Sequence, residues 1–142
     1  DLATSLESFL PLIDEITNGA DISVGSRYLA TSNLTRSFRR YVLSRIYHSC
    51  LINAFLAVPI SDVQCGFKAI DRVAFQKLSP HILDHSFFFE AEMLYSAHRM
   101  KMKIVEIPVN WVERTVSGVR LFCTSVSFFV GTIRLKFRYL FS

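Results

Sequence analysis

Hydrophobic and polar positions follow two different periods along the chain, and the changes of period predict its elements. The first apolar segment has Pro11 near its start and Asn18-Gly19 at its end, which favours a turn followed by a helix. Residues 21–24 then indicate a buried strand that leads into a Gly-Ser-Arg turn. From about 35 to 57 the spacing of apolar residues predicts a long helix, which Pro59 stops.

The second half of the chain alternates strands and helices. Residues 67–70 predict a short strand, and Asp71 is placed to cap a helix that ends near Leu78. The remaining elements are a helix from Ser86 or Phe87 to about Met100, strands over 103–107 and 109–112 separated by Pro108, and a final helix from near Val119. This order predicts an α/β fold.

The composition fits one domain or a piece of one. The chain has 142 residues, of which 51% are hydrophobic, including 13 Phe, and 20% are charged. Its two longest uncharged runs, 46–61 and 121–133, are shorter than the roughly 20 apolar residues of a membrane-spanning helix. The three cysteines lack CxxC spacing, which favours buried free thiols over a zinc site.

Basic residues are concentrated in two places, which indicates an anionic partner. No acidic residue follows Glu113, and one basic group lies beyond it: Arg114, Arg120, Arg134, Lys136 and Arg138. The other group is Arg36, Arg39, Arg40 and Arg45. Phosphate, lipid headgroups and nucleic acid all fit, and nucleic acid is the least favoured because no basic low-complexity tail is present.

One face of the predicted long helix suits a phosphate group. Arg36, Arg40, Ser44 and His48 recur every four residues and therefore line up. Forked guanidinium donors together with a neutral hydroxyl match phosphate oxygens. The alternative is a solvated basic face.

Three polar clusters stand at the ends of apolar runs, where an α/β sheet exposes the edge that binds ligands. They are Gly25-Ser26-Arg27, the segment from Asp62 to Lys68, and Glu90-Ala91-Glu92. In the second cluster, Gly66 offers bare backbone to a ligand, Gln64 offers an amide for a ligand hydroxyl, and Lys68 offers a positive charge. The alternative is a surface ion pair between Asp62 and Lys68.

The two carboxylates of the third cluster need different tasks. Glu90 and Glu92 are two residues apart, so they do not share a helix face. One interpretation is that Glu90 faces a ligand while Glu92 holds a neighbouring loop or arginine. The other is that both complement the dipole at the start of a helix.

The order and spacing of these clusters resemble the second half of a glycosyltransferase family 2 catalytic domain. The resemblance is to the branch that transfers a sugar from a nucleotide to polyprenyl or dolichyl phosphate, and Gln64-Cys65-Gly66-Phe67-Lys68 looks like its dolichyl-phosphate glucosyltransferases. It implies that residues 1–118 are the C-terminal, acceptor-side portion of a Rossmann-like GT-A domain. A basic amphipathic helix would follow over 119–142, and the nucleotide-binding half would lie upstream of residue 1.

The resemblance also implies roles for individual residues. The acceptor phosphate would be held by Arg27, Arg40 and Ser44, with Arg39 as the alternative to Arg40, and the donor diphosphate by Arg114 and Arg120 beside a hinge at Gly118. Asp62, Lys68 and Glu90 are the expected catalytic residues. Asp1 matches the last aspartate of an Asp-x-Asp motif and would bind a divalent cation, Mg²⁺ or Mn²⁺, although Ala3 replaces a glutamine that some relatives use.

The reaction implied is transfer of a sugar from a nucleotide-diphospho-sugar to a polyprenyl or dolichyl phosphate, with inversion. It would take place at the cytoplasmic face of a membrane and involve no nucleic acid. The final helix carries an apolar side with Arg134 and Arg138 opposite, which suits either a membrane interface or packing on the domain; that side comprises Phe122, Val126, Phe129, Val130, Ile133, Phe137 and Leu140. The alternatives are a family 2 transferase with a polysaccharide or other non-lipid acceptor, and a non-catalytic module that binds a membrane surface.

Overall fold

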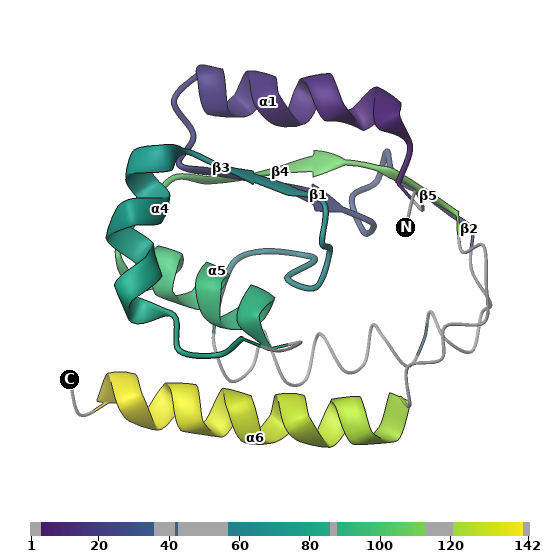
Figure 1. The fold of residues 1–142 in the computed structure, drawn as a ribbon. Coiled ribbons are helices and arrows are strands. Elements are labelled where there is room, and N and C mark those ends of the chain that lie inside the picture. The colour runs from purple at the N-terminus through teal and green to yellow at the C-terminus, as the bar shows by residue number, and fades with distance from the viewer. Residues whose placement is uncertain (1–3, 36–41, 43–56, 86–87, 113–120, 141–142) are drawn as a thin grey trace.

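The computed structural model of the chain describes residues 4–35, 42, 57–85, 88–112 and 121–140 (Figure 1). Of residues 34–35 and 121–128 it describes the backbone alone. Most of the long helix predicted over 35–57, and the loop over 113–120, lie outside these residues. Val42, inside the predicted long helix, is helical.

The N-terminal segment forms the predicted turn and helix. A 3-10 turn, η1 (Leu6–Ser8), leads into α1 (Phe9–Thr17), and Pro11 lies in the first turn of α1, where a missing N–H costs no hydrogen bond. The helix ends at Asn18, and Gly19 adopts a φ of 87°, a left-handed conformation that glycine takes without steric cost.

A three-stranded mixed sheet forms the centre of the fold. The middle strand β1 (Ile22–Ser26) is wholly buried and pairs antiparallel with β3 (Lys68–Ile70) and parallel with β4 (Ile104–Pro108). In this register Val24 lies opposite Lys68 on one side and Glu106 on the other. Cross-strand partners point to the same face, so two charged side chains flank a core residue near one end of the sheet.

A separate parallel pair of strands continues from the sheet. It consists of β2 (Asn33–Thr35) and β5 (Asn110–Val112). The sequence did not predict β2, because three residues are too few to establish a strand pattern. Pro108 was expected between the strands but is the last residue of β4, an edge strand where a missing donor is tolerated, and Val109 separates β4 from β5.

The other helices lie near their predicted positions. Asp71 caps α4 (Arg72–Leu78) by accepting hydrogen bonds from the backbone N–H groups of Val73 and Ala74, at 2.8 and 3.1 Å. The 3-10 turn η3 (Ser79–His81), α5 (Phe89–Arg99) and α6 (Leu121–Leu140) follow. No helix in the described part of the chain is both long and apolar enough to cross a bilayer.

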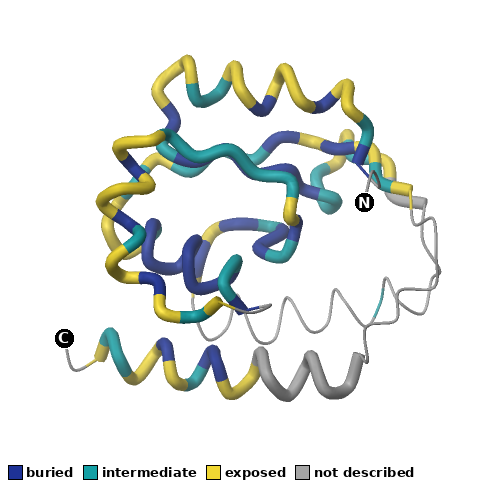
Figure 2. Tube along the Cα trace, viewed as in Figure 1, coloured by how far each residue is buried: buried dark blue, intermediate teal, exposed yellow. Residues whose placement is uncertain are grey.

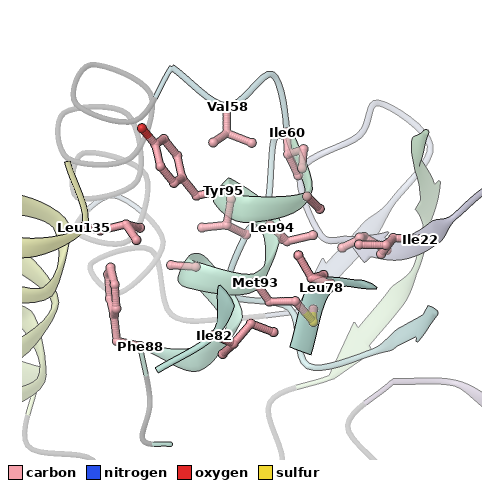
Figure 3. Close-up of a cluster of buried hydrophobic side chains, with 14 residues drawn as sticks. Ile22, Val58, Ile60, Leu78, Ile82, Phe88, Met93, Leu94, Tyr95 and Leu135 are labelled. Atoms are coloured by element: carbon pink, nitrogen blue, oxygen red, sulfur yellow. The ribbon is translucent and has the colours of Figure 1, made fainter. Parts of the chain in front are cut away.

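The elements form layers with α5 at the centre of the packing. Helix α1 covers one face of the sheet, α5 covers the other, and α6 runs along the outer side of α5 (Figure 1). Every residue of α5 from Ala91 to Ala97 is buried. The main core lies between β1 and α5, and Phe88 and Leu135 extend it to α6 (Figure 3). Helix α6 is therefore part of the same packed unit.

Helix α6 packs on the domain through one side. Thr132 and Leu135 are buried, Tyr139 donates a hydrogen bond to Ser96 at 2.9 Å, and a Cβ added at Gly131 would lie 2.8 Å from the ring of Phe88. The side open to solvent carries bulky apolar residues together with Lys136. We call the apolar residues the outer stripe of α6: Phe129, Val130, Phe137 and Leu140, with exposed fractions of 42%, 58%, 57% and 69%. Exposed positions alternate with buried ones along this part of the helix (Figure 2).

The close approach at Gly131 gives a direct test of how α6 is docked. Gly131→Val should improve helix propensity slightly, yet we expect it to lower the free energy of unfolding by about 1–3 kcal/mol because the side chain overpacks Phe88. Chemical denaturation followed by circular dichroism measures this. Val130→Ala on the outer stripe is the control and should change stability by less than about 0.5 kcal/mol. Equal effects of the two variants would contradict the docking described.

Candidate functional site

A carboxylate on β4 anchors the loop that carries the Asp62–Lys68 motif. Glu106 accepts hydrogen bonds from the backbone N–H groups of Ser61 and Asp62, at 2.9 and 3.2 Å, and from the Ser61 hydroxyl at 2.7 Å. The same hydroxyl lies 2.6 Å from that of Ser26 at the end of β1. The start of the motif is thus fixed to two strands of the sheet.

Asp62 and Arg27 form a buried pair at the end of β1. Asp62 is fully buried, and its Oδ2 accepts from the backbone N–H of Arg27 at 3.1 Å and from Nε at 2.6 Å. Its Oδ1 accepts from Nη2 at 2.8 Å. This bidentate arrangement, in which both carboxylate oxygens accept from one guanidinium, is the strongest geometry for such a pair.

The rest of the Arg27 guanidinium lies against aromatic rings. Its carbon is 5.1 Å from the ring centroid of Trp111 on β5 and 5.6 Å from that of Tyr28. Burial alone disfavours the charge, but the hydrogen bonds and the charge of Asp62 raise the pKa of Arg27 above its ordinary value. Within the described residues Nη1 donates to no group. Among these residues, Nη1 is thus the candidate donor of the guanidinium for an anionic ligand.

Lys68 and Glu90 form a second ion pair beside the same loop. The Lys68 ammonium contacts the Glu90 carboxylate and donates a hydrogen bond to the Val63 carbonyl at 3.2 Å. Burial lowers the pKa of Lys68, and the negative charge of Glu90 offsets part of that effect. The side chain of Lys68 is nearly enclosed, whereas 32% of Glu90 is exposed. The alternative of an ion pair between Asp62 and Lys68 is not what the structure shows, because each has another partner.

Cys65 lies in the loop that carries Asp62 and precedes Lys68. It is a buried free thiol, as the cysteine spacing predicted, and burial followed by the nearby Asp62 carboxylate raises its pKa. The charges of Arg27 and Lys68 act on it in the opposite direction. We call the Arg27–Asp62 and Lys68–Glu90 pairs together the charged cluster.

Glu92 belongs to a different network, on the side of α5 that faces α6. It is 2% exposed and accepts from the backbone N–H groups of Leu83 and Asp84, at 3.1 and 2.6 Å, and from Arg138 at 2.5 Å. Arg134 pairs with Asp84 at 3.1 Å. The interpretation that Glu92 holds a neighbouring loop or arginine is confirmed, and it holds both.

The two arginines of α6 differ in exposure. Arg138 is 31% exposed, whereas Arg134, at 64%, lies largely in solvent. Both bind acidic groups of the domain, Arg138 the buried Glu92 and Arg134 the Asp84 carboxylate in the loop before α5. Charge reversal at these positions would disturb the packing of α6.

The structure brings four of the predicted site residues together as Arg27–Asp62 and Lys68–Glu90. The others lie outside the described residues: Asp1, Arg40, Ser44, Arg114 and Arg120, together with Arg39 and Gly118. Among the described residues no group of three or more histidine, cysteine, aspartate or glutamate side chains is placed to hold a metal ion. Binding of Mg²⁺ or Mn²⁺ at Asp1 stays a prediction.

Sequence reasoning missed three members of the site: Ser61, Glu106 and Trp111. Glu106 had a visible signal, since it is the single acidic residue within the predicted strand over 103–107. A lone carboxylate in a strand that packs into a domain needs partners, and the structure supplies them from Ser61 and Asp62. Trp111 and Ser61 carried no comparable signal, because only the fold brings them to Arg27 and Glu106.

Comparison with known proteins reveals relatives along most of the chain. It is 37% identical to the glycosyltransferase AglD of Haloferax volcanii over 122 residues, which are 85% of this chain and 19% of AglD. It is 33% identical to the dolichyl-phosphate beta-glucosyltransferase of Dictyostelium discoideum over 126 residues, 87% of this chain and 38% of that protein. The human dolichyl-phosphate beta-glucosyltransferase is 32% identical over 138 residues, 95% of this chain and 42% of that protein. No family model matches the chain.

These relatives and the charged cluster agree with the motifs. The chain is homologous to the lipid-phosphate sugar transferases of glycosyltransferase family 2. Within that branch, its homologues include the dolichyl-phosphate glucosyltransferases and AglD. The chain spans less than half the length of the curated relatives it matches.

The Glu92 network gives a stability prediction. Glu92→Ala removes the acceptor of two backbone N–H groups and leaves Arg138 without its carboxylate, so we expect a loss of about 3 kcal/mol in the free energy of unfolding. Thermal and chemical denaturation measure the loss. Glu7→Ala, at an exposed position, is the matched control and should be nearly neutral. If Glu92→Ala were as stable as the control, the network would not hold α6.

Proposed function

We propose that the intact protein transfers a sugar from a nucleotide-diphospho-sugar to dolichyl or polyprenyl phosphate, with inversion at the anomeric carbon. The observation that carries the proposal is the charged Arg27 guanidinium, fixed by Asp62 at the end of β1 in a homologue of dolichyl-phosphate beta-glucosyltransferases. Since the chain spans only a portion of its relatives, the activity belongs to the whole protein.

The chemistry needs positioning more than proton transfer. A phosphate monoester has a second pKa of about 6, so the acceptor is largely ionised at neutral pH and is already a nucleophile. The protein must hold it in line with the anomeric carbon and stabilise the departing diphosphate. In the proposal, Arg27 is one phosphate ligand, and Arg40 and Ser44 are the others.

The donor side rests on residues outside the described part of the chain. Arg114 and Arg120 would stabilise the leaving diphosphate, and Asp1 would hold the divalent cation, Mg²⁺ or Mn²⁺. The cation would act as a Lewis acid and stabilise the negative charge of the leaving diphosphate. In this proposal the residues of the described site act on the acceptor and the sugar.

Among the expected catalytic residues, the geometry supports distinct tasks. Asp62 orients Arg27, because both of its oxygens are taken up by that side chain. Lys68 is enclosed and holds Glu90, whereas Glu90 is the more exposed member of the pair and lies in the first turn of α5. We assign Glu90 to a hydroxyl of the transferred sugar.

The sheet is consistent with the C-terminal portion of a Rossmann-like GT-A domain over residues 1–118. Among the described strands β3 pairs on one side only, and it runs antiparallel to β1. Its other edge is where a strand of the upstream half would add, because an edge strand presents unpaired N–H and C=O groups.

The outer stripe of α6 supports contact with a membrane surface, which in the proposal is the cytoplasmic face. The helix docks through Thr132 and Leu135 and turns its bulky apolar side chains outward. An amphipathic helix with this arrangement buries its apolar side in the boundary between headgroups and acyl chains. A lipid acceptor and a helix that meets lipid are consistent with each other, which favours the lipid over a polysaccharide acceptor.

The acceptor assignment is tested best at Arg40, because replacing Arg27 would also leave Asp62 buried without its partner. In the intact enzyme Arg40→Ala should raise the KM for dolichyl phosphate by tenfold or more, corresponding to about 1.5–3 kcal/mol for a charge-assisted contact. Nucleotide-sugar affinity should stay nearly unchanged. Arg72→Ala, an exposed arginine of α4, is the control. Equal loss of nucleotide affinity would contradict the assignment, and full tolerance of the change would favour a non-lipid acceptor.

Membrane contact is tested by flotation of the chain with anionic liposomes. Phe137→Ser with Leu140→Ser should release it from the liposomes with little change in melting temperature, because both side chains are exposed. Leu135→Ser, on the buried side, should instead destabilise the fold by several kcal/mol. If the Phe137→Ser, Leu140→Ser variant unfolded and its flotation with liposomes stayed unchanged, the membrane assignment would be wrong.

A further inference from the structure

We infer that Glu106 is a positioning residue for the acceptor-phosphate site, acting on Arg27 through the Ser61-Asp62 turn. The inference rests on the proposed function, in which Arg27 contacts the lipid phosphate. It adds a residue that none of the motifs contains and that touches neither substrate in the proposal.

The first step is the anchoring of the turn. Glu106 lies opposite Val24 in the sheet register, so its carboxylate stands beside the end of β1. Its Oε1 accepts from the Ser61 N–H at 2.9 Å, the Ser61 hydroxyl at 2.7 Å and the Asp62 N–H at 3.2 Å, and Oε2 accepts from the Ser61 N–H at 3.0 Å. A charged acceptor for several donors fixes the backbone on both sides of the Ser61-Asp62 peptide bond.

The second step is the direction in which Asp62 points. With its N–H held by Glu106, the buried Asp62 side chain presents one oxygen to Nε and the other to Nη2 of Arg27. Asp62 also accepts the backbone N–H of Arg27 at 3.1 Å. The turn therefore sets the position of the Arg27 guanidinium, and Glu106 sets the position of the turn.

The third step is the placement of Nη1, the guanidinium nitrogen of Arg27 that Asp62 does not bind. The Trp111 ring lies 5.1 Å from the guanidinium carbon and limits movement on that side. Displacing a catalytic or binding group by about 1 Å is enough to reduce a rate strongly, so a loosened turn should weaken acceptor binding while the charge of Arg27 persists. Loss of Glu106 should thus resemble a mild defect of Arg27 itself.

The kinetic test is a double-mutant cycle in the intact enzyme with dolichyl phosphate and nucleotide sugar. Glu106→Gln keeps the size of the side chain but replaces one acceptor oxygen by an amide donor. It should raise the KM for dolichyl phosphate by about tenfold, with kcat and the KM for nucleotide sugar nearly unchanged. In an Arg27→Lys background the same change should have little further effect, because residues acting through one contact are not additive. Glu7→Gln is the matched control.

A measurement independent of activity tests the placement of Arg27 directly. In the ¹⁵N-labelled chain, the Arg27 Nε–H should exchange slowly with solvent, since it is buried and bonded to Asp62. Glu106→Gln should accelerate this exchange by tenfold or more, and Glu7→Gln should not. If Glu106→Gln fails to fold, Ser61→Ala carries the same tests, because it removes the hydroxyl that bonds Glu106 and Ser26.

The outcomes separate the inference from the proposed function. Multiplicative effects of Glu106→Gln and Arg27→Lys, or unchanged Arg27 Nε–H exchange in Glu106→Gln, would overturn the positioning role. Absence of sugar transfer to dolichyl phosphate by the intact enzyme would instead overturn the proposed function, while the exchange measurement would still decide how Arg27 is held.

Discussion

The Asp62 carboxylate is fully buried, and compensating that charge is the constraint on which the site depends. An ionised carboxylate without partners in a protein interior costs far more than a domain of this size can tolerate. Arg27 supplies the opposite charge in bidentate geometry, and the backbone N–H of the same residue adds a third hydrogen bond. The end of β1, the loop before Cys65 and the ring of Trp111 are thereby held in one arrangement. A pair of this kind contributes little net stability but specifies which groups lie together.

The sequence predicted local features that depend on neighbouring residues. Asp71 as a helix cap, the ending at Asn18-Gly19 and the amphipathic final helix all follow from propensities that act within a few positions. The different tasks of Glu90 and Glu92 followed from helical geometry, since residues two apart point to different sides. The grouping of Arg27, Asp62, Lys68 and Glu90 in one site came from the order of the motifs and their resemblance to a known family.

Local sequence patterns did not predict which residues pair with one another in the site. Nothing in the spacing shows that Asp62 pairs with Arg27 rather than with Lys68, because the choice depends on how the loop crosses the sheet edge. The same holds for Arg138, whose partner Glu92 is far away in sequence and adjacent only through the packing of α6. The strand β2 was missed for a related reason, as its pairing with β5 rather than its own composition makes it a strand.

In aqueous buffer without lipid, the outer stripe of α6 is a surface through which copies of this chain would associate. Phe129, Val130, Phe137 and Leu140 present apolar surface that water solvates poorly, and copies of the chain that meet along it remove that surface from solvent. Under the proposed membrane contact, self-association in such a buffer would reflect the missing lipid phase rather than a native assembly. Detergent micelles or nanodiscs, which cover the stripe as an acyl-chain boundary would, are the medium in which hydrodynamic size reports the protein itself.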